Sequence, residues 1–151
     1  MPRVEVVEQV PVSLDAVWSA VNDVESFPRL MDHVHAVEVL DSGAEFRRSA
    51  WEIDLKGCRM RWVEHEEILA DVHRIEYRQV EGDLKTFEGH WQLEAVDAAT
   101  TRVTLTVHFE IGLPMLSDML DPVAERAIRN NSTEMLHAVS AAAGARALER
   151  R

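Results

Sequence analysis

The sequence contains little cysteine, little positive charge and no long apolar run. Its single cysteine, Cys58, cannot close an internal disulfide, so the reducing cytoplasm is the expected location. Asp and Glu outnumber Lys and Arg by 27 to 16. The net charge of -11 argues against nucleic acid or an anionic membrane surface as the partner, because both attract clustered positive charge. Neither a signal-peptide pattern nor an apolar stretch of membrane-spanning length is present, so membrane insertion is not expected.

Apolar residues are abundant enough for one hydrophobic core. They make up 46% of the 151 residues, and the chain carries no repeat, linker or low-complexity segment. Residues 1–151 are therefore expected to form a single domain. The acidic composition favours a neutral or weakly charged small molecule as the partner.

The order of the sequence patterns predicts strands and short helices first, then a long meander. A strand is expected from Arg3 to Val10, and Ser13 is a natural N-cap for a short helix that Asn22-Asp23 ends. The stretch SFPRLM indicates a second short helix. From Val34 to Ile111 the apolar residues recur with period two, interrupted at SGA, KG, AD, EGDLK and DAATT, which predicts six antiparallel strands.

The C-terminal part has a helical pattern from about Ser117 to Ala143. A helix with one apolar side needs a sheet face to cover it, and a curved sheet around one long helix tends to leave a cavity between them. The fold class expected is therefore α+β, with about seven antiparallel strands around a long C-terminal helix. The expected apolar stripe consists of Leu120, Ala124, Ala127, Asn131, Met135, Ala138 and Ala142.

The stretch AWEIDLKGCRMRWVEHEE, residues 50–67, predicts a hairpin with a two-residue turn at Lys56-Gly57. This register pairs Asp54 with Arg59 and Glu52 with Arg61 on one face, and Trp51 with Trp62 on the other. Opposite charges facing each other support the register, because a slip by one residue would invert every face.

The strands that follow extend this register across the sheet. A second two-residue turn at Ala70-Asp71 would place Glu64 opposite Tyr77. Beyond the EGDLK loop, Arg78 is expected beside Glu88. The last strand is expected to direct Val103, Leu105, Val107 and Phe109 to the face that carries the tryptophans.

Several motifs resemble the polyketide cyclase and aromatase group of the START-like (SRPBCC) superfamily. They are VWSAVNDVESFPRLM, KGCRMRWVEHE, EGDLKTFEGHWQL, VTLTVHFEI and NNSTEMLHAV, and they occur in the same order and spacing over nearly the whole chain. The resemblance implies a helix-grip fold with an internal cavity. Quinone-binding proteins and ribosome-associated toxin-like proteins share NDVESFP and EGDLKTFEGHW, so the site must decide the activity.

The resemblance implies a cofactor-independent cyclase that closes a ring on a poly-β-ketone intermediate by aldol addition and loss of water. The arginine and tyrosine that hold substrate in this group correspond to Glu66 and Val34 here, so neither is carried over. The aromatic lining and the polar helix positions that contact substrate oxygens are carried over, at Trp62, Trp91, Asn131 and Glu134. An acyl carrier protein could deliver the substrate, although such carriers are usually acidic, which disfavours tight docking with this chain.

Polar side chains on the inward face suggest the chemistry of such a cyclase. The register places Arg47 opposite Glu66 and Ser49 opposite Glu64. An aldol closure needs a base to remove a proton between two carbonyls and a donor for the enolate oxygen. Glu64 or Glu66 would be the base, and the donor would be Arg47 or one of two further inward residues, Tyr77 and Asn131. A carboxylate beside tryptophans should have a raised pKa, which suits proton transfer near neutrality.

The Arg47–Glu66 pair has a second interpretation, as a structural ion pair at the open end of the sheet where the inward face meets water. This interpretation favours Glu64, one pair deeper, as the catalytic group. The alternative function is a non-catalytic binding protein for a quinone, lipid or aromatic molecule. A carrier needs volume and few titratable groups, whereas an enzyme needs such groups poised in the cavity.

The expected cavity wall is aromatic and suits a planar or aliphatic ligand. Trp18 is expected in the core instead. The wall residues are Trp51, Trp62, Phe87, Trp91 and Phe109.

No metal site and no cofactor are expected. The pair His33 and His35 and the row His65, Glu76 and His90 could suggest a metal, but the row lies on the charged outer face. Cys58 is in phase with the inward face without a histidine to activate it, so it is expected to be a buried, inert thiol.

Overall fold

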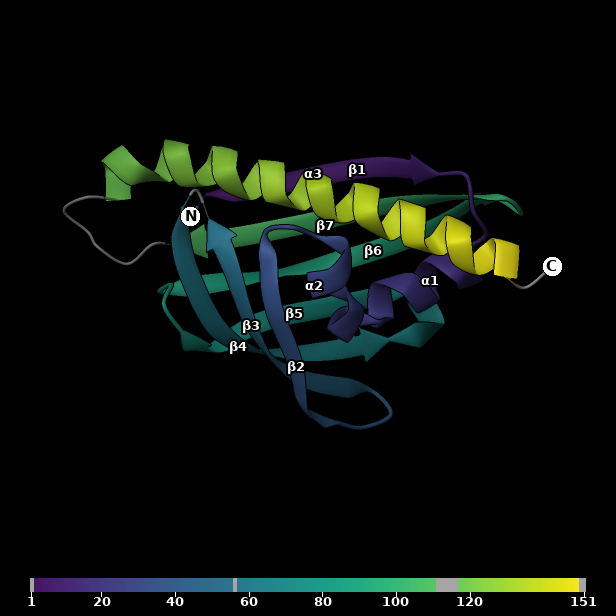
Figure 1. Ribbon diagram of the computed structural model, residues 1–151, viewed down its shortest axis with the longest axis horizontal. Coiled ribbons are helices and arrows are strands. Elements are labelled where there is room, and N and C mark those ends of the chain that lie inside the picture. Colours follow the sequence, from purple (N-terminus) through teal and green to yellow (C-terminus); the bar gives the residue numbers. More distant parts are fainter. Residues whose placement is uncertain (1, 56, 111–116, 150–151) are drawn as a thin grey trace.

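The computed structural model describes residues 2–55, 57–110 and 117–149. Seven antiparallel strands form one curved sheet, and a long helix lies across its concave side (Figure 1). The elements are β1 (Arg3–Val10), α1 (Leu14–Asn22), the one-turn helix η1 (Val24–Ser26), α2 (Phe27–Leu30), β2 (Val34–Ser42), β3 (Phe46–Leu55), β4 (Cys58–Leu69), the one-turn helix η2 (Ala70–Val72), β5 (Arg74–Gly82), β6 (Thr86–Asp97), β7 (Thr100–Glu110) and α3 (Ser117–Glu149).

The strand order β1-β7-β6-β5-β4-β3-β2 is a meander from β2 to β7, with β1 returning to pair with β7. Figure 1 shows α1 and α2 on the same side of the sheet as α3. The predicted α+β class, the first strand, the two short helices and the six-stranded meander are confirmed. The helix α3 continues to Glu149, six residues beyond the predicted end.

The predicted register of β3 and β4 is confirmed in every pair, including Trp51 with Trp62 and Asp54 with Arg59. Gly57 at the turn has a φ of 82°, which glycine adopts without a steric penalty. The pairing of Arg78 with Glu88 is confirmed as well.

The predicted register of β4 and β5 is wrong by two residues. Glu64 pairs with Gln79, and Tyr77 pairs with Glu66. The connection is not a two-residue turn at Ala70-Asp71, because the turn of helix η2 is followed by His73 in a left-handed conformation (φ 53°). A shift of two residues keeps every side chain on its predicted face, since the strand period is two.

The buried face of α3 lies about one residue away from the predicted stripe. Asn131 and Met135 are half-buried at the edge of this face, and the side chain of Leu120 lies outside the described residues. The helix packs against α1 and against strands β1, β7 and β3 of the sheet, and its most buried row faces these elements. That row consists of Ala127, Ile128, Ser132, Leu136, Val139 and Ala143.

Cys58 is exposed, so the prediction of a buried thiol is wrong. Its position in phase with Trp62 was predicted correctly, but it is the first residue of β4 and lies at the open tip of the hairpin. Alternation assigns a face and does not determine whether that face is covered at the end of a strand.

Candidate functional site

A cavity of about 70 Å³ lies between the concave face of the sheet and α3. Pockets for drug-sized ligands are typically about 300–1,000 Å³. A ligand larger than a few atoms therefore requires wall side chains to move, and the flexible Met60 and Met135 are suited to this. The apolar part of the wall includes Phe27, Trp51, Trp62, Ile75, Phe87, Trp91, Leu105 and Val107.

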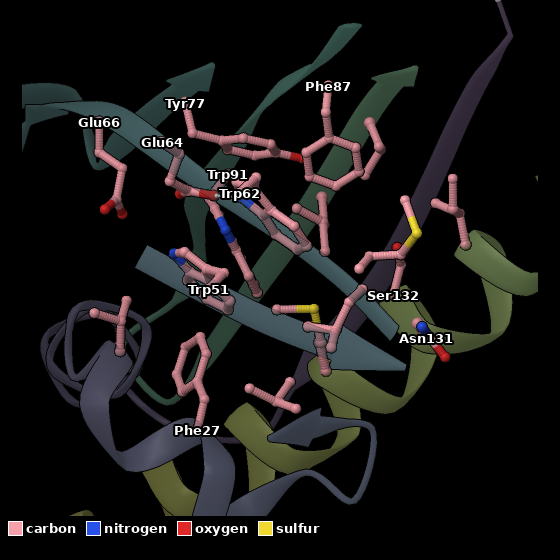
Figure 2. Close-up of a pocket in the computed structure, with 18 of the residues that line it drawn as sticks. Phe27, Trp51, Trp62, Glu64, Glu66, Tyr77, Phe87, Trp91, Asn131 and Ser132 are labelled. Carbon is pink, nitrogen blue, oxygen red and sulfur yellow. Dashed lines mark hydrogen bonds between the residues drawn. The ribbon is translucent and has the colours of Figure 1, made fainter. Parts of the chain in front are cut away.

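The predicted aromatic wall is present except for one residue. The rings of Trp51 and Trp62 stack with centroids 5.9 Å apart and planes 4° from parallel, and Phe87 lies 4.9 Å from Trp62. Trp91 lines the same cavity, as Figure 2 shows. Phe109 is not part of the wall, because it is completely buried and packs in the core.

Arg47 and Glu66 form a buried ion pair. Arg47 donates from Nη2 to Glu66 Oε1 at 2.6 Å and from Nε to Glu66 Oε2 at 3.1 Å. The guanidinium also donates from Nη1 to the backbone oxygen of Asn22, the last residue of α1, at 3.0 Å. The two residues are 7% and 3% exposed. The interpretation of a solvated pair at the open rim is therefore wrong, because the end of α1 covers this part of the sheet.

Ser49 completes the environment of Glu66. Its hydroxyl donates to Glu66 Oε2 at 2.8 Å and accepts a bond of the same length from Trp51 Nε1. The backbone of Ser49 lies opposite Glu64 as predicted, but the side chain turns to the other glutamate. Both carboxylate oxygens of Glu66 are thus occupied, which leaves this residue poorly placed to act as a base.

Glu64 differs from Glu66 in having one hydrogen-bond donor. Trp62 donates from Nε1 to Glu64 Oε1 at 2.8 Å, and within the described residues Oε2 accepts no hydrogen bond. The residue is 5% exposed and lines the cavity. Burial, and secondarily the charge of Glu66, raises the pKa of Glu64 well above its ordinary value, and the bond from Trp62 opposes this only in part. Glu64 therefore presents to the cavity a carboxyl oxygen that no described residue engages.

Tyr77 lies beside Glu64 in Figure 2, but its hydroxyl donates to the backbone oxygen of Thr106 at 2.9 Å. The ring reaches this oxygen because Gly89 has no side chain; a Cβ at that position would lie 1.9 Å from the Thr106 oxygen. Burial raises the pKa of Tyr77, so the phenol stays neutral. Tyr77 is a wall residue whose proton is already engaged, which argues against its predicted role as donor to an enolate.

The two predicted polar residues of α3 have different positions. Asn131 lines the cavity and donates from Nδ2 to the backbone oxygen of Asp54 at 3.0 Å. Glu134 is not part of the wall. It accepts a bond from the backbone N–H of Asp32, and its Oε2 lies 3.3 Å from His33 Nδ1. The prediction for Glu134 is wrong because the helix directs it toward the start of β2.

Several site residues were not identified from the sequence. Ser132 belongs to the buried row of α3, and its helical spacing from Ile128 and Leu136 was the available signal. Asn22 holds Arg47 through its backbone oxygen at 3.0 Å and its side-chain Oδ1 at 3.4 Å, a contact between distant residues for which the sequence contains no signal. His33 also lines the cavity, and burial lowers its pKa while Glu134 opposes this.

The predicted row of His65, Glu76 and His90 is only partly present. Glu76 pairs with His90, but His65 lies opposite Arg78. In the described part of the chain, no group of three or more His, Cys, Asp or Glu side chains is arranged to hold a metal ion. None of the described helices is long and apolar enough to cross a membrane.

Known proteins resemble this chain over most of its length. The sequence model of the family described as "Polyketide cyclase / dehydrase and lipid transport" matches residues 10–136. The crystal structure of TTHA0849 from Thermus thermophilus has a TM-score of 0.89 and 25% identity, and the match covers 95% of this chain and 98% of that one. The Zhui aromatase/cyclase from Streptomyces sp. R1128 has a TM-score of 0.83 and 25% identity, with 96% and 94% covered.

A curated sequence relative is the ribosome association toxin RatA of Pseudomonas aeruginosa. It is 24% identical over 118 residues, which are 78% of this chain and 81% of RatA. The structural matches confirm the helix-grip expectation. Together the relatives support a general role in binding or cyclising a small molecule.

Proposed function

The chain belongs to the polyketide cyclase / dehydrase and lipid transport family, and from this premise we propose that it catalyses aldol ring closure and dehydration of a poly-β-ketone intermediate. The single observation that carries the proposal is Glu64. It is a buried carboxyl with a raised pKa at the wall of an apolar cavity. Its Oε2 accepts no hydrogen bond from the described residues. Such a group exchanges protons with a ligand near neutral pH.

In the proposed ring closure, ionised Glu64 takes a proton from the carbon between two carbonyl groups. The enolate formed attacks another carbonyl carbon of the same chain, which forms the carbon–carbon bond and leaves an alkoxide. The neutral Glu64 carboxyl then returns its proton to the alkoxide, so the enzyme ends in its starting state.

The loss of water uses the same group in the same order. Glu64 takes the proton beside the remaining carbonyl and delivers it to the departing hydroxyl, so one double bond and one water molecule form. Neither step changes the oxidation state of the substrate as a whole, so no redox cofactor is required. The stacked Trp51 and Trp62 would hold the growing ring flat.

In this proposal the other polar residues are positioning residues. Arg47 and Glu66 neutralise each other and hold the end of α1 against the sheet. Tyr77 and Asn131 donate hydrogen bonds to backbone oxygens and form part of the cavity wall. We also propose that delivery by an acyl carrier protein would be transient, because the net charge of -11 repels an acidic carrier.

One observation favours a second function, the binding of a quinone, lipid or aromatic molecule without chemistry. The hydrogen-bonding groups of Arg47, Glu66 and Tyr77 are directed at the protein itself. An apolar wall with few exposed polar atoms is sufficient for a carrier. The two functions therefore differ in whether Glu64 only contacts the ligand or also transfers its proton.

The experiment that separates them is incubation with a minimal polyketide synthase, followed by analysis of the products. Wild-type protein should increase the cyclised, dehydrated product, and Glu64→Gln should reduce its rate of formation by about 10²-fold or more. Glu67→Gln is the matched control, because Glu67 is an exposed residue of the same strand and lies outside the wall. An unchanged product distribution with wild-type protein, combined with measurable ligand binding, would support the carrier and refute the enzyme.

A further inference from the structure

Ser132 is a buried serine of α3 that lines the cavity and is 3% exposed. Within the described residues its hydroxyl makes no hydrogen bond, and its oxygen is not among the inaccessible polar atoms that lack a partner. The hydroxyl is therefore available to bond to a ligand in the cavity.

The next residue shows what a helical hydroxyl ordinarily does. Thr133 donates to the backbone oxygen of Arg129, four residues earlier, at 2.9 Å. The corresponding acceptor for Ser132 is the backbone oxygen of Ile128, and the described part of the chain has no such bond. Thr133 thus uses its hydroxyl to bond to its own helix, whereas Ser132 leaves its hydroxyl available to the cavity.

Glu64 and Ser132 reach the cavity from opposite walls. Glu64 lies on β4 and Ser132 on α3, and in the view of Figure 2 the ring of Trp62 lies between them. Each offers one polar atom without a partner among the described residues, and the wall between them is aromatic. The cavity is thus polar at two separated points and apolar between them.

We propose that Ser132 is a second polar anchor, and that the cavity takes a cyclic or aromatic molecule with oxygen functions at two opposite ends. One oxygen would lie against the Glu64 carboxyl and the other against the Ser132 hydroxyl. A serine hydroxyl can donate and accept, so the distal oxygen can be a carbonyl or a hydroxyl. This inference rests on the proposed function, because it names the ligand class of the same cavity and leaves the reaction at Glu64 unchanged.

The test compares aromatic molecules with one and two hydroxyl groups by isothermal titration calorimetry. The probes are phenol against hydroquinone, and 2-naphthol against 2,6-dihydroxynaphthalene, which span two separations between the oxygens. At least one of the two diols should bind wild-type protein about fivefold to tenfold more tightly than its mono-alcohol, which is the effect of one buried hydrogen bond. Ser132→Ala should reduce this advantage below about twofold.

Thr133→Ala is the matched control, because it removes the neighbouring hydroxyl of α3 without touching the cavity wall. It should keep the full advantage of the diol. If the mono-alcohols bind but no diol gains affinity, or if Ser132→Ala keeps the gain, the second anchor is refuted while ligand binding stands. If none of the four probes binds, the proposed cavity function fails together with the anchor.

Discussion

Trp62 donates a hydrogen bond of 2.8 Å from Nε1 to Glu64 Oε1, two residues later on the same face of β4. The same indole stacks on Trp51, whose Nε1 is directed to Ser49 and through it to Glu66. One indole thus serves each carboxyl group, Trp62 directly and Trp51 through Ser49. Glu66 is neutralised by Arg47, whereas Glu64 keeps one oxygen for the cavity.

The pH dependence of stability should reveal the raised pKa of Glu64. A carboxyl whose pKa is higher in the folded state contributes stability that is fully present below its unfolded value of about 4.5 and is lost as the pH rises through the folded value. Glu64→Gln removes this loss. In urea unfolding, the free energy of unfolding of the variant relative to wild type should therefore increase as the pH rises above about 4.5. A difference that stays constant with pH would contradict a raised pKa of Glu64.

Breaking the ion pair of Arg47 should be costly because it leaves a buried charge without a partner. Arg47→Met should lower the free energy of unfolding by about 3–5 kcal/mol, and Arg47→Met combined with Glu66→Met should lower it less. Arg61→Met is the comparison, since Arg61 pairs with Glu52 while 70% exposed and should cost less than about 1 kcal/mol. Equal small losses for Arg47 and Arg61 would show that the first pair is solvated.

The absence of a side chain at Gly89 should be essential to the position of Tyr77. Gly89→Ala places a Cβ against the backbone oxygen of Thr106, so we expect a loss of about 2 kcal/mol or more and an altered near-ultraviolet circular dichroism spectrum. Gly144→Ala is the matched control, because nothing lies within 4 Å of its added Cβ. That change in α3 should stabilise by roughly 1 kcal/mol. An equal effect of the two substitutions would mean that Tyr77 does not need the gap.

His33 should respond to pH with the sign opposite to Glu64. Its pKa is lowered from 6.5 by burial, with Glu134 opposing, so its contribution to stability is present above pH 6.5 and is lost as the pH falls through the folded value. Histidine signals followed by NMR should give a midpoint below 6.5, and Glu134→Gln should lower this midpoint further. A midpoint above 6.5 in the folded protein would show that the charge of Glu134 outweighs burial.

The sequence was sufficient to predict which side chains lie on each face of the sheet, and insufficient to predict which elements cover those faces. The pairs of β3 and β4 could be predicted because opposite charges and a glycine turn agree on one register. The pairing of Glu64 with Tyr77 could not, because the left-handed His73 has no signal in the sequence. The shift by two residues changed the cross-strand partners of Glu64 and Tyr77 and left the same side chains on the inward face.

The positions set by long-range packing were the ones missed. The burial of Arg47 depends on Asn22, which is distant in sequence and contributes a backbone oxygen that every residue possesses. Glu134 and Ser132 differ by two positions on α3, a rotation of about 200°. The sequence pattern placed the most buried row of this helix one residue away from its true position, which is why Ser132 was overlooked, whereas Glu134 was selected from the family resemblance.

The proposed role of Glu64 requires a carboxyl whose pKa is raised at the wall of an apolar cavity. The most direct measurement is the NMR titration of the side-chain carboxyl carbon of Glu64, assigned by comparison with Glu64→Gln. The expected midpoint lies well above 4.5. A substitution in the wall that admits water, such as Trp51→Phe, should move this midpoint down, because burial is the main cause of the raised pKa. A midpoint at or below 4.5 in wild-type protein would show an ordinary carboxylate and contradict the proposed role.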